Sequence, residues 1–109
     1  MAAIWKKYVP IEGGENKFLK CELYYSLGGM NYFTYKNEPR GYYLSVSPVV
    51  KKDMDGCMME SYEAFSGIKK CLVEVKRKSK TKEALAVSMI QWNLDDLIAE
   101  VMAKNGLSA

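Results

Sequence analysis

Apolar side chains alternate with other residues over 18–25 and again over 42–47, and this alternation limits the fold more than any other feature of the chain. Residues 18 to 25 place Leu, Cys, Leu and Tyr on one face and Phe, Lys, Glu and Tyr on the other. A period of two is that of a strand with one face buried. The chain therefore predicts a β-sheet, with ordered structure beginning at Lys17.

Three further strands are predicted, over residues 31–35, 42–50 and 57–65. The Gly28-Gly29 pair is typical of a hairpin turn, and residues 53–56 of a second turn. Pro48 predicts an edge strand or a bulge, because proline has no amide hydrogen for a central ladder. The Met and Glu content of residues 57–65 suits a helix equally well.

The hydrophobic period changes at Ser66-Gly67. Ile68, Cys71, Leu72 and Val75 follow at helical spacing, which predicts a helix capped by Ser66. We expect a second helical stretch over residues 82–91, and a last helix that begins at Asn93 and stops at Asn105-Gly106. The predicted class is α+β, an antiparallel sheet of four or five strands followed by C-terminal helices.

The length of 109 residues suits one domain with one modest core. We expect a single domain over residues 1–109. Its parts are a loose N-terminal arm over 1–16 with one short strand near Tyr8, strands over 17–66 and helices over 67–106.

Seven basic residues and a single acid, Glu74, lie between Gly67 and Lys82. The basic residues are Lys69, Lys70, Lys76, Arg77, Lys78, Lys80 and Lys82. This segment carries a formal charge of +6, against −3 for the rest of the chain. Such a block on a predicted helix favours contact with a polyanion. The alternative is a solvated face that keeps the protein in solution.

Tyrosines form a second candidate feature, since seven Tyr residues lie between residues 24 and 62 on the expected strands. Tyr32 and Tyr43 are the rings we expect to stack on nucleic-acid bases. The alternative is ordinary packing, because Tyr is also a good strand former.

No catalytic or metal-binding constellation is found in the sequence. The chain has no histidine, the residue most often used for proton transfer near neutral pH. The spacing of Cys21, Cys57 and Cys71 fits neither a disulfide framework nor a zinc site, and we expect Cys71 to belong to the core. Asp53 and Asp55 lack the other ligands of a calcium loop. We therefore expect no enzymatic activity, no metal and no cofactor.

The N-terminal residues lack the apolar stretch of a secretion signal, and no apolar run approaches the length of a membrane span. These features predict a cytoplasmic protein with free thiols and no membrane contact.

Residues 31–49, followed by the segment 61–67 and a basic stretch, resemble a family of short proteins encoded by gut Firmicutes, their phages and mobile elements. The resemblance covers about residues 17 to 82. Small proteins of this origin are similar to anti-CRISPR proteins, so the resemblance implies an inhibitor of a type II CRISPR nuclease in the bacterial cytoplasm. It implies no particular site residues.

A second resemblance is one of topology. Four antiparallel strands followed by a helix are similar to the Whirly and positive-coactivator class, whose curved sheets bind single-stranded nucleic acid, usually as homodimers. The two resemblances imply a CRISPR nuclease, or DNA or RNA, as partner. We expect Arg40 to join the seven basic residues, Tyr32 and Tyr43 in the binding surface.

Overall fold

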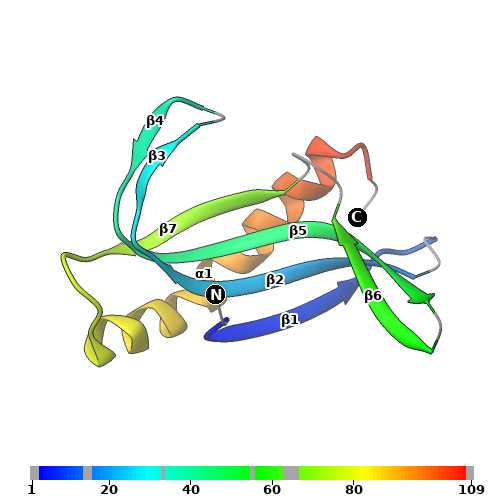
Figure 1. Ribbon diagram of the computed structural model, residues 1–109, viewed down its shortest axis with the longest axis horizontal. Helices are drawn as coiled ribbons and strands as arrows, with labels where there is room; N and C mark the ends of the chain where they lie inside the picture. The colour runs from blue at the N-terminus through cyan, green and yellow to red at the C-terminus, as the bar shows by residue number, and fades with distance from the viewer. Residues whose placement is uncertain (1–2, 14–15, 33, 55, 63–66, 108–109) are drawn as a thin grey trace.

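The computed structural model describes residues 3–13, 16–32, 34–54, 56–62 and 67–107 of the chain. Five strands form one antiparallel sheet, two more form a separate ribbon, and one long helix lies against the sheet (Figure 1). The elements are β1 (Trp5–Pro10), β2 (Lys17–Ser26), β3 (Gly29–Asn31), β4 (Lys36–Glu38), β5 (Gly41–Met54), β6 (Cys57–Tyr62), β7 (Ile68–Glu74) and α1 (Lys80–Lys104). The α+β class is confirmed, but the expectation of several C-terminal helices is wrong: the described C-terminal part forms one.

Strand β5 is the centre of the sheet. One side of it pairs with β2, which in turn pairs with the edge strand β1. On its other side, residues 41–46 pair with β7 and residues 49–54 pair with β6. Pro48 falls in the interval between these two partners. The expectation of an edge strand at Pro48 is therefore wrong; a missing amide hydrogen is tolerated where β5 changes its neighbour.

The two faces of the sheet have different environments. Alternate side chains of β2 and β5 enter a core with α1, which contributes Ala86, Ile90, Leu97 and Val101. From the sheet this core contains Leu19, Cys21, Leu23, Tyr42, Leu44 and Val46. The opposite side of the sheet, which we call the open face, presents Glu22, Tyr24, Ser45, Ser47 and Lys69. The helix therefore lies on one face only (Figure 1).

The helix predicted to follow Gly67 is a strand, β7. Its register with β5 shifts between Tyr42 and Tyr43, which pair with Val73 and Cys71. Leu72 is thus an extra residue, a β-bulge, and both Leu72 and Val73 are buried. The expected cap Ser66 lies outside the described residues. Cys71 is consequently a half-buried strand residue rather than part of a helix core.

The single helix α1 begins much later than predicted and has no break. Ser79 is its N-cap and accepts a hydrogen bond from the backbone N–H of Lys82 at 3.1 Å. Asn93, the predicted cap of the last helix, lies inside α1 and its amide donates to the carbonyl oxygen of Met89 at 2.8 Å. The predicted ending at Asn105-Gly106 is confirmed: Asn105 is the C-cap and Gly106 has φ of 67°.

Two expectations for the N-terminal half are also corrected. The short strand expected near Tyr8 is confirmed as β1, but because it pairs with β2 from Trp5 to Pro10, order begins before Lys17 and the described part of residues 1–16 is not a loose arm. Gly28-Gly29 does not close a hairpin between two strands of the main sheet, and among the described residues of the predicted strand 31–35 only Asn31 belongs to a strand, β3. The chain leaves the sheet at Gly28 and forms the β3–β4 ribbon. A side chain on Gly28 would collide with the backbone near Glu38, and its φ of 74° also favours glycine.

Strand β5 is longer than the predicted 42–50. It reaches Met54 and pairs with Cys57 at the start of β6, as expected for a turn over residues 53–56. Strand β6 ends at Tyr62, and the rest of the predicted strand, residues 63–65, lies outside the described residues, as does Asp55.

Candidate functional site

The strand geometry of β7 separates the first two basic residues of the charged segment. Lys69 and Lys70 point to opposite faces, as successive residues on a strand do. Lys69 Nζ lies 2.7 Å from Glu38 Oε1 on the ribbon, whereas Lys70 Nζ donates to Asn93 Oδ1 of the helix at 2.7 Å. Both ammonium groups therefore have partners within the protein, and they do not act together.

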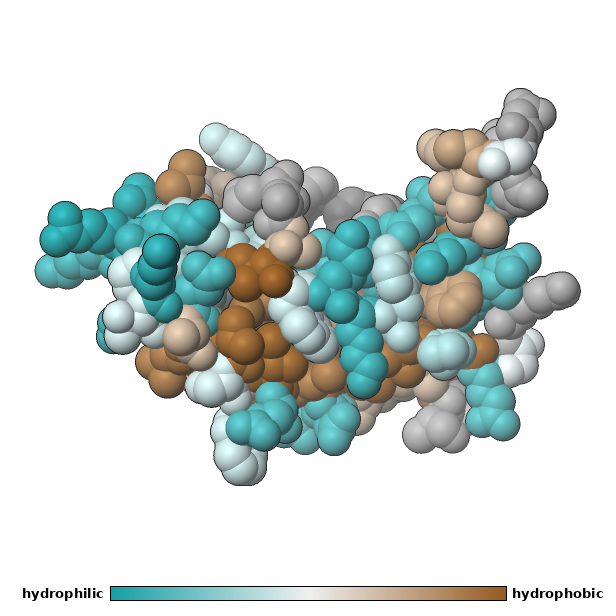
Figure 2. Space-filling model, turned by 90° about the horizontal axis from the view of Figure 1, so that it is seen from below, coloured by the Kyte–Doolittle hydropathy of each residue, from teal (hydrophilic) through white to brown (hydrophobic). Residues whose placement is uncertain are grey.

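The other five basic residues of the segment remain together. Lys76, Arg77 and Lys78 are exposed in the connection between β7 and α1, and Lys80 and Lys82 are exposed in the first turn of α1. Arg40 joins them, because its Nη1 donates to the carbonyl oxygen of Lys76 at 3.1 Å. We call Arg40, Lys76, Arg77, Lys78, Lys80 and Lys82 the basic end. Figure 2 shows strongly hydrophilic side chains at the end of the molecule where Figure 1 places this connection.

Local structure concentrates positive charge at the basic end. Among the ion pairs of the described residues, none includes any of its six members. The N-terminus of α1 lies at the same place and adds the partial positive charge of the helix dipole. Lys78 Nζ lies 5.5 Å from the ring centre of Tyr25, a cation–π contact, and the Lys78 side chain as a whole remains exposed. The acids nearest in sequence are Glu38, Glu74 and Glu83, and Glu38 is already paired with Lys69, so the six basic residues leave an excess of positive charge.

The ribbon beside the basic end exposes two tyrosine rings. Tyr32 is 78% exposed and Tyr35 is 81% exposed, in the turn between β3 and β4. Tyr35 has a φ of 56°, uncommon for a residue with a side chain. Its N–H donates to the carbonyl oxygen of Asn31 at 2.7 Å, and the Asn31 side chain donates to Glu38 Oε2 at 3.1 Å. These hydrogen bonds tie Asn31 and Tyr35 to the ribbon, and both tyrosine rings are exposed to solvent.

Tyr43 does not provide an exposed ring. It is 4% exposed and stacks on Tyr24 with ring centres 5.9 Å apart. Its hydroxyl donates to the carbonyl oxygen of Pro39 at 2.6 Å, and burial raises its pKa to about 12. Of the two tyrosines predicted to stack on bases, the structure leaves only Tyr32 accessible. The predicted binding surface does not include Tyr35, which is an exposed ring. The neighbouring Lys36-Asn37 is a turn signal that could have indicated its exposure.

The open face of the sheet is partly closed by β6. Glu60 accepts hydrogen bonds from the Tyr8 hydroxyl and, at 2.8 Å, from Lys20 Nζ. Lys51 Nζ lies 3.7 Å from the ring centre of Tyr8 and 4.8 Å from that of Phe18. The cations on this part of the sheet thus contact carboxylates or rings of the protein, which makes the open face a weaker candidate than the basic end for contact with a polyanion.

The Glu60 network predicts how stability depends on pH. The hydrogen bonds from Lys20 and Tyr8 lower the pKa of Glu60. A lowered folded-state pKa stabilises the protein above the ordinary carboxyl pKa, and this contribution is lost as pH falls through the folded value. We expect Glu60→Gln to lower the melting temperature at pH 7 and to reduce its fall between about pH 5 and pH 3. Thermal melts across this range test the expectation; Glu100→Gln on the exposed side of α1 is the control, and equal curves for wild type and Glu60→Gln would contradict it.

The cysteines show no sign of an activated nucleophile. Burial raises the pKa of the Cys71 thiol, and it raises that of Cys21 to about 11. Both thiols are therefore protonated near neutral pH. Among the described residues there is no cluster of three or more Cys, Asp or Glu side chains placed to hold a metal ion.

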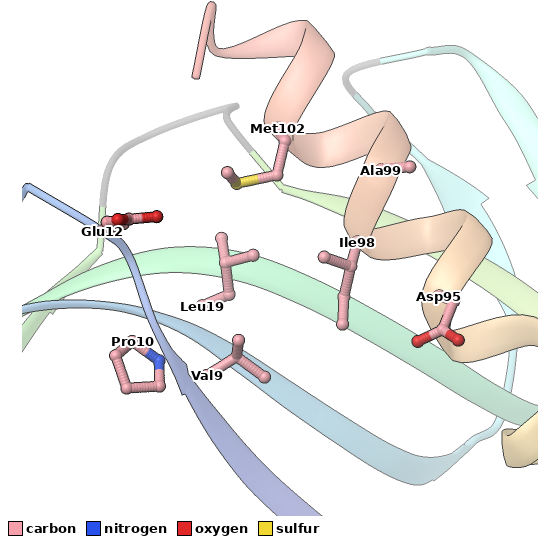
Figure 3. A pocket seen from close by; sticks show the side chains of 8 residues that line it. All are labelled: Val9, Pro10, Glu12, Leu19, Asp95, Ile98, Ala99 and Met102. Carbon is pink, nitrogen blue, oxygen red and sulfur yellow. The ribbon is translucent and has the colours of Figure 1, made fainter. Parts of the chain in front are cut away.

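A cavity of about 350 Å³ lies between β1 and α1. Figure 3 shows Val9, Leu19, Ile98 and Met102 around this space, with the carboxylates of Glu12 and Asp95 toward its two sides. Its lining is mostly apolar and its charged groups are both acidic. The cavity therefore does not suit an anionic ligand and is separate from the basic end.

No protein-family model matches the chain, and comparison with curated proteins and with solved structures found no match. In the part of the chain that the structure describes, the helix does not contain an apolar stretch of the kind that crosses a membrane.

Proposed function

We propose that this protein binds single-stranded nucleic acid without catalysing a reaction. The observation that carries the proposal is the basic end, in which six exposed Lys and Arg side chains gather around the N-terminus of α1. Nucleic-acid backbones are the common polyanions of a cell, and their affinity for proteins comes largely from such contacts. Arg40 and Arg77 add the planar guanidinium groups that suit phosphate oxygens.

The ribbon supports a single-stranded ligand in particular. Bases are free to stack on protein rings when they are unpaired, and Tyr32 and Tyr35 are the most exposed large apolar side chains of the described residues. Arg40 follows the ribbon within two residues of Glu38 and its Nη1 donates to the carbonyl oxygen of Lys76, so the base of the ribbon adjoins the basic end, while the tyrosine rings lie at the turn of the ribbon (Figure 1). Phosphates would lie along the basic end while bases contact the ribbon.

Replacing Tyr32 and Tyr35 together by Ala is expected to weaken binding of a single-stranded oligonucleotide by about 30-fold or more, because each stacked base contributes about 1–3 kcal/mol and two rings are removed. Fluorescence anisotropy with a labelled oligonucleotide measures the change. The matched control replaces both residues by Phe, which keeps the rings and should keep most of the affinity. Unchanged affinity in the double Ala variant would show that the rings do not stack on bases.

Inhibition of a type II CRISPR nuclease is the second candidate function, as the resemblance to anti-CRISPR proteins implies. Exposed apolar side chains favour it: Leu27 lies just before the ribbon and Met30 on β3, both are exposed, as the two tyrosines are, and side chains of this kind can contact a partner protein. Target cleavage by a guide-loaded nuclease, with and without the protein, distinguishes the two functions. Inhibition of cleavage without affinity for free oligonucleotides would replace the first proposal by the second.

A further inference from the structure

The outer side of α1 carries a stripe of side chains that the sheet does not cover. The helix buries Ala86, Ile90, Leu97 and Val101 against the sheet. At 3.6 residues per turn, Leu85, Ser88 and Trp92 lie on the opposite side. Leu85 is 46% exposed and Trp92 is 75% exposed. An exposed Trp and Leu one heptad apart are costly on a free surface and typical of a helix that packs against another helix.

One end of this stripe carries a basic residue and the other end an acidic one, so its charges complement those of an identical stripe running in the opposite direction. The stripe has its centre between Ser88 and Met89. Leu85 lies three residues before Ser88, and Trp92 lies three residues after Met89, so the two are equally far from this centre. Farther out, Lys82 lies six residues before Ser88, whereas Asp96 lies seven residues after Met89. Lys82 and Asp96 are both exposed. The stripe is therefore basic at one end, acidic at the other and apolar between them.

We infer that this stripe joins two copies of the protein through an antiparallel pair of α1 helices. A two-fold axis near Ser88 places Leu85 against the partner's Trp92 and Lys82 beside the partner's Asp96, with each contact made twice. Parallel pairing would instead set Lys82 beside the partner's Lys82 and Asp96 beside the partner's Asp96. Ser88, a small residue at the centre, permits close approach of the two helices.

The inferred dimer leaves the other surfaces accessible. The stripe lies on the side of α1 away from the sheet, so the open face and the ribbon remain uncovered, and Lys82 is the member of the basic end that borders the stripe. The helix is about 38 Å long, and one helix pair buries less surface than a standard protein interface. We therefore expect a dissociation constant on the order of micromolar. The inference does not depend on binding of nucleic acid.

Light scattering coupled to size exclusion, from about 5 to 500 µM protein, tests the inference. The mass should rise from 12.4 kDa toward twice that value as concentration increases. Trp92→Glu should weaken association at least about tenfold while circular dichroism stays unchanged, because Trp92 is largely exposed. Met59→Glu, an exposed apolar residue on β6, is the control and should leave association unchanged.

Charge reversal tests the antiparallel register. Lys82→Asp and Asp96→Lys should each weaken association about three- to tenfold, and the double variant should regain it, since the pair is restored with its signs exchanged. A mass of 12.4 kDa at every concentration, a dimer that Trp92→Glu leaves intact, or a double variant as weak as the single variants would overturn the inference.

Discussion

Replacing Lys76, Arg77, Lys78 and Lys80 by Glu is expected to weaken binding of a single-stranded oligonucleotide at least about 100-fold at physiological salt. Each substitution removes an attraction to phosphate and adds a repulsion. The fold should survive, because all four side chains are exposed. Lys80 lies in the first turn of α1, where a negative side chain interacts better with the helix dipole than a positive one. Anisotropy titrations and circular dichroism on the same samples measure both effects.

A matched pair of variants separates a local effect from one of net charge. Lys76→Glu with Lys78→Glu changes the basic end, and Lys17→Glu with Lys52→Glu makes the same charge change on β2 and on the distal part of β5. The first double variant should lose most of the affinity and the second little. Equal losses would mean that the protein attracts nucleic acid through its overall charge alone.

Leu44→Ala is expected to cause the largest loss of stability. Leu44 is fully buried on β5, between Leu23 of β2 and Lys70 of β7, and belongs to the core shared with α1. Truncating a buried Leu costs about 2–5 kcal/mol, a large part of the stability of a small domain. The melting temperature should fall by about 10 °C or more.

Thermal denaturation followed by circular dichroism measures this loss. Leu27→Ala is the control, because Leu27 is exposed and its truncation opens no cavity. A melting temperature for Leu44→Ala within about 2 °C of the wild type would contradict the core described above.

The sequence predicted the strands whose alternation is regular and failed where a bulge interrupts it. In β2, Leu19, Cys21 and Leu23 enter the core while Glu22 and Tyr24 lie on the open face, and the predicted strand, 18–25, falls within the observed Lys17–Ser26. In β7 the bulge adds Leu72 to the buried side next to Val73. Because two consecutive residues are buried, the apolar residues of β7 do not follow the period of two that identifies a strand. Their spacing instead matches that of a helix, which is why the sequence predicts a helix here.

The predictions from Asn93 and Pro48 are also wrong, because the structural role of each residue depends on contacts with segments far away in the sequence. Asn93 suggested a helix start, but inside α1 its side chain bonds to Met89 and accepts from Lys70. Pro48 suggested an edge strand, but it lies where β5 exchanges β7 for β6. Both outcomes depend on pairing between segments far apart in the chain.

Part of the candidate site could be predicted, since its residues are contiguous. Lys76, Arg77, Lys78, Lys80 and Lys82 remain together whether the segment is a helix or a loop, and the charge block identified them directly. The separation of Lys69 from Lys70 required the strand assignment of β7. The burial of Tyr43 depends on its stacking with Tyr24 across β2 and β5, which the sequence of either strand alone does not reveal.

An NMR titration of the ¹⁵N-labelled protein with a single-stranded oligonucleotide tests the central proposal most directly, because it locates the contact surface residue by residue. The proposal predicts amide shifts concentrated at Arg40, residues 75–82 and the ribbon from Gly29 to Glu38, decreasing as salt is added. The indole N–H signals of Trp5 and Trp92 serve as reporters outside this surface. Shifts confined to the open face around Ser45 and Ser47, or to the cavity between β1 and α1, or no shifts at low salt, would contradict it.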